Sequence, residues 1–149
     1  MPPQTPDAPP RPSVADPLLG TVLHGKFRVD QALGKGGAGK VYVATQLSLG
    51  RPVALKVLRD DVNIEGDERF VERFYREAAL AGALSHPNVV TVHDYGRTDE
   101  GICYIAMELL DGRSLKQILR DGPMELERAL DLFEQVVRGL RHAHRAGLV

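Results

Sequence analysis

Three glycines between two runs of β-forming residues constrain the fold of this chain more than any other feature. Gly34, Gly36 and Gly39 have the spacing G-x-G-x-x-G, and the flanking runs 27–33 and 41–46 are predicted to be strands. Because glycine lacks a Cβ atom, backbone N–H groups in such a loop can approach phosphate oxygens closely. The same spacing also occurs in hairpins that bind nothing, so the surrounding sequence must decide between the two interpretations.

The residues that follow the glycines distinguish among the known kinds of glycine-rich phosphate-binding loop. The glycine-rich turn of a dinucleotide-binding fold opens a helix, and a P-loop ends in Gly-Lys-Ser or Gly-Lys-Thr. Here Lys40 and Val41 continue into a strand. The sequence therefore predicts a strand, a glycine-rich turn and a second strand.

Alternating apolar runs and helical periodicity together predict an α+β fold. An antiparallel sheet of five strands is expected over 27–33, 41–46, 52–58, 89–95 and 102–107. Helices are expected over 68–84, 114–119 and 125–146. The second helix has a capping box, in which Ser114 is followed by Gln117.

A lysine in the third expected strand and a glutamate in the first helix form a candidate pair. Side chains alternate along a strand, so Ala54 and Lys56 share one face of the sheet. A lone strand lysine usually points into solvent. Glu77, however, lies at about −20° on a helical wheel that starts at Phe70, inside the expected apolar stripe. A carboxylate on a buried helix face needs a cation, so an ion pair between Lys56 and Glu77 is expected.

That stripe is defined by four apolar positions, Phe70, Phe74, Ala81 and Leu84.

In this order and spacing, these motifs resemble the N-terminal part of a protein kinase of the eukaryotic-like serine/threonine type found in bacteria. The glycines with Val41 match the family's G-x-G-x-x-G-x-V signature, and Val53-Ala54-Leu55-Lys56 matches V-A-I-K with one conservative change. The resemblance continues through His86-Pro87-Asn88, similar to the link into the fourth strand, and through Met107-Glu108-Leu109-Leu110, similar to the gatekeeper and hinge. It covers roughly residues 24 to 149.

The resemblance implies a binding site for Mg·ATP. Lys56 would pair with the α- and β-phosphates and with Glu77, and these two are the implied catalytic residues. The backbone of Glu108 and Leu110 would hydrogen-bond adenine. The residues implied to contact ATP are Leu33, Gly34, Gly36, Gly39, Val41, Ala54, Lys56, Met107, Glu108 and Leu110.

The resemblance also divides the chain. Residues 1–23 hold seven of the ten prolines and are expected to be a disordered segment outside the domain. An incomplete kinase domain is expected over 24–149, with an N-lobe over about 24–107, a hinge over 108–112 and the start of a C-lobe over 113–149. The His-Arg-Asp catalytic loop and the Asn and Asp-Phe-Gly ligands of Mg²⁺ do not occur in the sequence, so we expect no metal site here and no activity from these residues alone.

Composition excludes several other classes of protein. The 19 Lys and Arg residues are interleaved with 20 Asp and Glu residues, which argues against nucleic-acid binding. A single cysteine, Cys103, excludes a disulfide framework and favours a cytoplasmic location. No stretch approaches the roughly 18 apolar residues that a membrane-spanning helix requires.

Three functional interpretations remain. The first is a serine/threonine protein kinase, which transfers the γ-phosphoryl group of ATP to a hydroxyl of a protein substrate. The second is a non-catalytic lobe that binds a nucleotide or a partner, because the last helix has an apolar face that needs a cover. The third is a gene fragment without a function of its own. The apolar face comprises Ala129, Phe133, Val136, Leu140 and Ala143.

Overall fold

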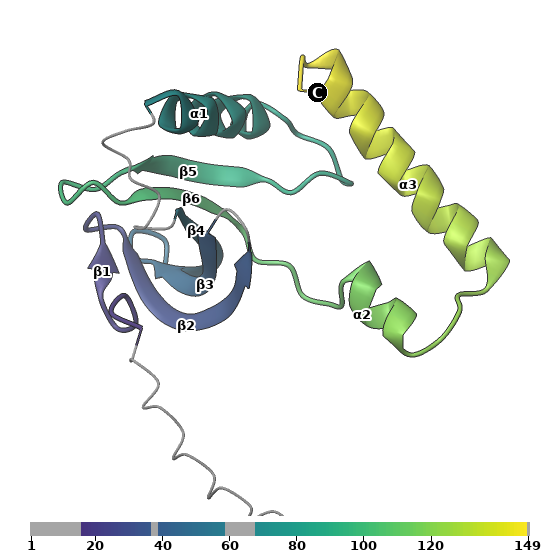
Figure 1. Ribbon diagram of the computed structural model, residues 1–149, viewed down its shortest axis with the longest axis horizontal. Coiled ribbons are helices and arrows are strands. Elements are labelled where there is room, and N and C mark those ends of the chain that lie inside the picture. The colour runs from purple at the N-terminus through teal and green to yellow at the C-terminus, as the bar shows by residue number, and fades with distance from the viewer. Residues whose placement is uncertain (1–15, 37–38, 59–67, 149) are drawn as a thin grey trace, which may run out of the picture.

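The computed structural model describes residues 16–36, 39–58 and 68–148 as a curled antiparallel sheet with one helix packed on it and two helices that extend away from it (Figure 1). The strand order is β1-β2-β3-β4-β6-β5. The strands are β1 (Val22–Leu23), β2 (Phe27–Gly36), β3 (Gly39–Gln46), β4 (Arg51–Leu58), β5 (Val92–Arg97) and β6 (Cys103–Glu108). The helices are α1 (Glu68–Gly82), α2 (Leu115–Arg120) and α3 (Leu126–Arg145).

This architecture confirms the α+β prediction. All five expected strands and all three expected helices are present, with boundaries shifted by a few residues. The sixth strand, β1, is only two residues long and is too short to produce an alternating pattern in the sequence.

The main core lies on one face of the sheet. Along β4, Val53 and Leu55 are fully buried on this face, and β6 adds Tyr104 and Ala106. Because side chains alternate, the residues between them lie on the opposite face. That opposite face carries Ala54 and Lys56, and it is also the face on which α1 packs.

Helix α1 packs through Phe74 and Ala78, which are both buried, and it lies along β5. Phe74 joins Leu58 and Cys103 in a second apolar cluster. The helix ends at Gly82 rather than at Leu84, because the N–H of Leu84 turns back to the carbonyl oxygen of Ala81 at 3.1 Å. Such i to i+3 bonds tighten the end of a helix.

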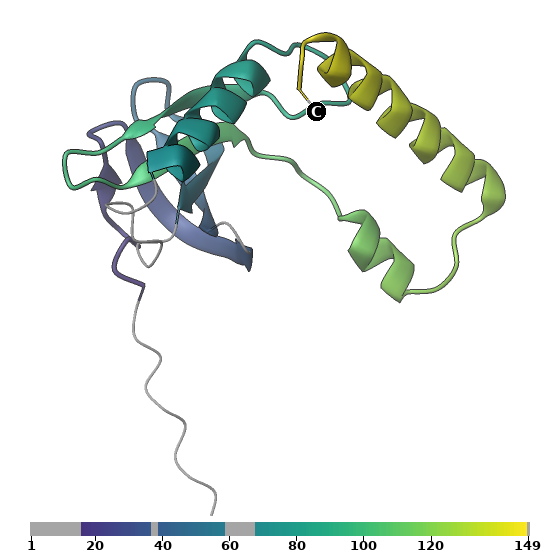
Figure 2. The same cartoon turned by 45° about the horizontal axis from the view of Figure 1, so that its top comes forward.

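Helices α2 and α3 form an arm beyond the hinge (Figure 2). The predicted capping box is confirmed: Ser114 Oγ accepts from the Gln117 N–H at 3.2 Å, and Gln117 Oε1 accepts from the Ser114 N–H at 2.7 Å. Across 16–36, 39–58 and 68–148, none of the helices is both long and apolar enough to cross a bilayer.

Helix α3 returns to the first lobe at the 86–88 loop. Asn88 Nδ2 donates to Gln135 Oε1 at 3.1 Å, and the rings of His86 and His142 lie 5.0 Å apart. Gly139 is buried at this contact, where an added Cβ atom would lie 2.7 Å from the carbonyl oxygen of Asn88. The helix therefore approaches the loop as closely as its backbone allows.

Residues 16–23 belong to the packed structure, although they were expected to lie outside it. Leu23 is 4% exposed and sits in the main core, and β1 pairs with the start of β2. The structured part of the chain therefore extends at least to Asp16 rather than beginning at residue 24. The rest of the expected disordered segment, 1–15, lies outside the described residues.

Candidate functional site

Strand pairing brings four of the expected site residues onto one face of the sheet. Val41 on β3 is the register partner of Lys56 on β4, and Ala54 on β4 is the partner of Met107 on β6. Partners across antiparallel strands point to the same side. The lysine therefore lies between an apolar strand residue and the small side chain of Ala54, on the face opposite the main core.

The glycine-rich turn lies at one end of this face. Gly36 pairs with Gly39 at the end of the β2–β3 ladder, and Gly34 pairs with Val41. Residues 37 and 38 lie outside the described residues. A register shift between Ala32 and Gly34 places Leu33 at a bulge, where it is 51% exposed.

Two of the glycines meet different surroundings. Gly39 has φ +150°, and a Cβ atom on it would lie 2.1 Å from the carbonyl oxygen of Val57, so the fold itself requires glycine there. A Cβ atom on Gly34 would meet nothing within 4 Å. Packing among the described residues therefore gives no reason for glycine at position 34.

The expected hinge begins where β6 ends. The Glu108 N–H donates to the carbonyl oxygen of Thr91 at 2.9 Å, and Glu108 Oε1 accepts from the Thr91 N–H at 2.6 Å. Its side chain is thus engaged with the chain just before β5. Leu110 is 65% exposed, and Gly112 has φ +142°, a conformation that favours glycine, before α2 begins.

One histidine beside the hinge has a shifted pKa. Burial lowers the pKa of His93 on β5, the charge of Arg51 lowers it further, and Glu108 opposes the change. Burial and Arg51 thus both favour the neutral ring of His93.

The prediction that Glu77 lies on the buried face of α1 and pairs with Lys56 is wrong in this structure. Its side chain is 58% exposed, and its Oε1 atom accepts from Nε of Arg73 at 2.9 Å. Among the described residues, no ion pair joins Lys56 to Glu77. The pair with Arg73 has the i, i+4 spacing typical of helix surfaces, and that spacing was a usable signal in the sequence.

The physical reason is the rotation of α1 about its own axis. On a helical wheel the buried side chains Phe74 and Ala78 lie at about 60° and about 100° from Glu77. The expected stripe included Leu84, which lies beyond the end of the helix at Gly82. Without that residue the centre of the apolar face moves away from the glutamate.

Among the described residues, no group of three or more His, Cys, Asp or Glu side chains is arranged to hold a metal ion. We therefore assign no magnesium ligand within residues 16–36, 39–58 and 68–148.

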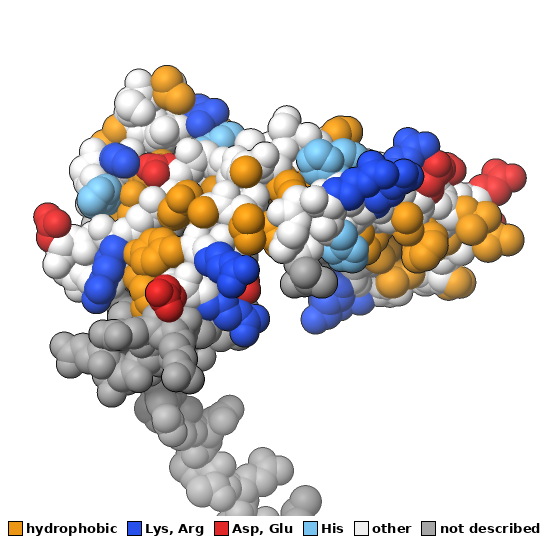
Figure 3. Space-filling model, turned by 90° about the horizontal axis from the view of Figure 1, so that it is seen from above, with side chains coloured by type: hydrophobic (Ala, Val, Ile, Leu, Met, Phe, Trp, Pro, Cys, Tyr) orange, Lys and Arg blue, Asp and Glu red, His pale blue; other side chains and the backbone are white. Residues whose placement is uncertain are grey.

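The apolar face expected on the last helix is exposed. Phe133 is 66% exposed and Leu140 is 51% exposed, and Figure 3 shows hydrophobic side chains along the arm that α3 forms. The exposed face also includes Leu126, Leu130, Val136 and Val137. Nothing else in the described residues covers it.

The chain resembles known protein kinases. The family described as "Protein kinase domain" matches residues 27–149. The serine/threonine-protein kinase Pkn3 of Myxococcus xanthus is 44% identical over 135 residues, which are 90% of this chain and 24% of that protein. PknA of Mycobacterium tuberculosis is 42% identical over an alignment of 138 residues, which covers 89% of this chain and 32% of that protein.

Solved structures agree with the sequence comparison. The kinase domain of M. tuberculosis PknI superposes with a TM-score of 0.76 at 32% identity, over 87% of this chain and 52% of that one. The chain thus spans about half of a solved kinase domain and a smaller share of the curated relatives. With the glycine-rich turn, the strand lysine and the hinge in their expected order, the chain belongs to the protein kinase family, as part of a kinase domain of the bacterial serine/threonine type.

Proposed function

We propose that this chain is the ATP-binding part of a serine/threonine protein kinase, which transfers the γ-phosphoryl group of ATP to a protein hydroxyl. One observation carries the proposal: Val41, Ala54, Lys56 and Met107 share a sheet face that ends at the glycine-rich turn. Along that face the apolar side chains would contact the flat base, and Lys56 and the turn would contact the phosphate chain.

The phosphate end would be held by Lys56 and by the turn. The ammonium group of Lys56 would bind the α- and β-phosphates as a point charge. Backbone N–H groups at Gly34, Gly36 and Gly39 would approach phosphate oxygens. The open space around Gly34 supports this role, because a Cβ atom there would obstruct only an incoming ligand.

The adenine end would lie against the hinge. Leu33, Val41, Ala54 and Met107 would provide an apolar slot. The Glu108 N–H already donates to Thr91, so its contact with adenine would come from its carbonyl oxygen. The Leu110 N–H would supply the second hydrogen bond to the base.

Glu77 would act on the nucleotide only through Lys56. In the described structure it is paired with Arg73, so this role requires α1 to turn toward the sheet and Glu77 to exchange partners.

Phosphoryl transfer needs groups in addition to those that hold ATP. Catalysis of this type depends on positioning and charge stabilisation, including Mg²⁺ and a base for the substrate hydroxyl. The His-Arg-Asp and Asp-Phe-Gly motifs that supply these groups in the family do not occur in the sequence. We therefore expect these 149 residues alone to bind ATP without transferring phosphate. We place the kinase in the cytoplasm, in keeping with the free, buried thiol of Cys103.

Calorimetric titration of the full chain with ATP tests the proposal. Lys56→Met should weaken ATP binding at least ten-fold, about 1.4 kcal/mol, because it removes the charge that faces the phosphates. Lys116→Met, on exposed α2, is the matched control and should bind as the wild type does. Equal affinities for all three proteins would overturn the assignment of the nucleotide site.

The exposed face of α3 keeps open the second interpretation, a lobe that binds a partner without catalysis. Light scattering after size-exclusion chromatography distinguishes the two. A monomer that binds ATP supports the first interpretation, and a stable assembly without ATP binding supports the second.

A further inference from the structure

Asp16 lies six residues before β1, at the edge of the proline-rich segment, and its side chain contacts three other residues. Its Oδ2 atom lies 3.0 Å from Nζ of Lys40 and accepts from the hydroxyl of Tyr42 at 2.9 Å. Its Oδ1 atom accepts from the Leu18 N–H at 3.2 Å. The side chain of Asp16 is 16% exposed, whereas that of its partner Lys40 is 41% exposed.

The segment that follows Asp16 is also hydrogen-bonded to β2. The Gly20 N–H donates to the carbonyl oxygen of Val29 at 2.8 Å, and the Val29 N–H donates to the carbonyl oxygen of Thr21 at 2.9 Å. Leu18 packs against the main core. Residues 16–21, which we call the strap, therefore join β2 to β3 from the core side of the sheet.

The two β3 residues that Asp16 holds are the neighbours of a proposed site residue. Lys40 and Tyr42 flank Val41, and alternation places Val41 on the opposite face with Lys56. Lys40 also directly follows Gly39, the last glycine of the turn. The contact with Asp16 keeps the ammonium group of Lys40 on the core face, away from the face proposed for the phosphates.

We propose that Asp16 is a positioning residue for the nucleotide site: through Lys40 and Tyr42 it fixes the start of β3, and so the position of Gly39 relative to the phosphates. This inference rests on the proposed function. Asp16 touches no expected ligand atom and acts only through β3.

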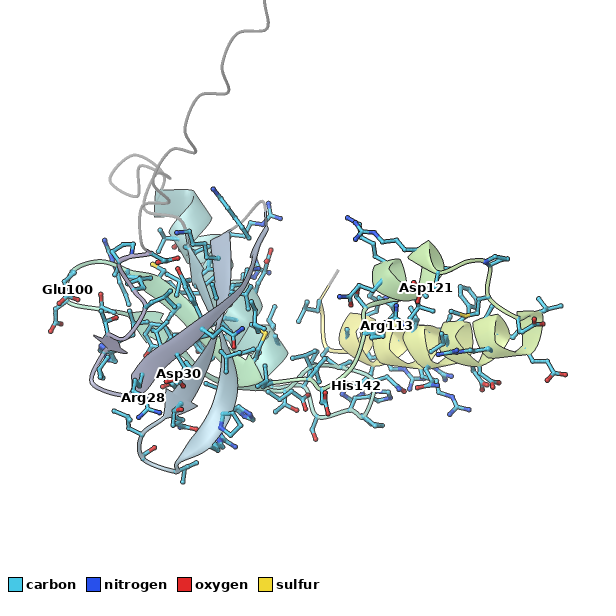
Figure 4. All side chains as sticks on the ribbon, turned by 90° about the horizontal axis from the view of Figure 1, so that it is seen from below. Arg28, Asp30, Glu100, Arg113, Asp121 and His142 are labelled. Atoms are coloured by element: carbon cyan, nitrogen blue, oxygen red, sulfur yellow. The ribbon has the colours of Figure 1, made fainter. Side chains whose placement is uncertain are left out.

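Asp30 provides a matched control. It also makes an ion pair and a hydroxyl contact, with Arg28 Nε at 2.7 Å and Thr45 Oγ1 at 2.6 Å. Arg28 and Asp30 lie together on β2 (Figure 4), near the end of the strand that is far from the turn. Asp30→Asn therefore removes a similar charge without touching the strap.

The first measurement is amide hydrogen exchange of the full chain without nucleotide. Asp16→Asn should speed exchange at residues 39–42 about five-fold, and Asp30→Asn should leave these amides unchanged. The second measurement is ATP affinity, at a temperature where every variant is folded. Asp16→Asn should weaken binding about five-fold, and Asp30→Asn less than two-fold.

A double-mutant cycle separates positioning from a general loss of stability. In a Lys40→Met/Tyr42→Phe background, Asp16→Asn should change ATP affinity less than two-fold, because its route to the turn has already been removed. An unchanged five-fold effect in that background would overturn the proposal.

The proposal and the function on which it rests fail in different ways. If Lys56→Met weakens ATP binding and Asp16→Asn behaves as Asp30→Asn does, the strap has no positioning role and the nucleotide site stands. If Lys56→Met binds ATP as the wild type does, the nucleotide site is wrong, and the role of Asp16 in it is overturned with it.

Discussion

Oε1 of Glu77 lies 2.9 Å from Nε of Arg73, one turn earlier on α1, and both side chains are more than half exposed. An exposed i, i+4 pair contributes little to folding. We expect Glu77→Gln to leave the midpoint of urea unfolding unchanged. Phe74→Ala, from the buried face of the same helix, should cost about 3 kcal/mol. A large loss of stability in Glu77→Gln would mean that the carboxylate is buried after all.

The two ends of the glycine-rich motif should respond differently to alanine. Gly39→Ala forces a Cβ atom to within 2.1 Å of the Val57 carbonyl oxygen at φ +150°, so it should destabilise the fold by about 2 kcal/mol. Gly34→Ala meets nothing within 4 Å and should leave the melting temperature unchanged while weakening ATP binding. Thermal unfolding and calorimetric titration of both variants check this. Equal melting temperatures would contradict the contact at Gly39.

Gly139 tests the contact between α3 and the first lobe. Alanine in a helix interior usually stabilises by about 0.5–1 kcal/mol relative to glycine. Here the added Cβ atom would lie 2.7 Å from the Asn88 carbonyl oxygen, so Gly139→Ala should instead weaken the docking of α3. Hydrogen exchange at residues 86–89 should rise in this variant.

Gly82→Ala is the control for that experiment, because a Cβ atom there meets nothing within 4 Å. It should leave exchange at residues 86–89 unchanged. Protection equal to the wild type in both variants would show that α3 does not rest on the loop.

Asp16 should make stability depend on pH in the acid range. Burial raises the pKa of Asp16, but hydrogen bonds from Lys40, the Leu18 N–H and Tyr42 together outweigh it, so the pKa lies below its ordinary value of 3.8. A carboxyl with a lowered folded pKa stabilises fully above its ordinary value, and this stabilisation is lost as the pH falls through the folded pKa.

Asp16→Asn should therefore be less stable than the wild type by about 1–2 kcal/mol at pH 7, with a difference that shrinks below about pH 4. Urea unfolding at pH 7, 5 and 3 measures this difference. A difference that stays constant across the three values would show that the charge of Asp16 does not carry the contact.

Alternation and helical periodicity in the sequence predicted the order of the strands and helices. They also predicted the face of the sheet on which each strand residue lies. Alternation placed Ala54 and Lys56 on one face, and strand pairing then brought Val41 and Met107 beside them. The capping box at Ser114 was equally local, since both partners lie within one helical turn.

The tertiary structure decided what periodicity cannot specify. Helical spacing defines which residues of α1 share a face, but packing of Phe74 and Ala78 on the sheet sets the rotation of the helix. This rotation leaves Glu77 on the exposed side of α1, where it pairs with Arg73. Asp16 reaches residues 24 and 26 positions further along the chain, and only the folding of the strap beneath β3 brings those groups together. Local patterns are set by backbone geometry within a few residues, whereas contacts between distant segments depend on how whole elements bury their apolar faces.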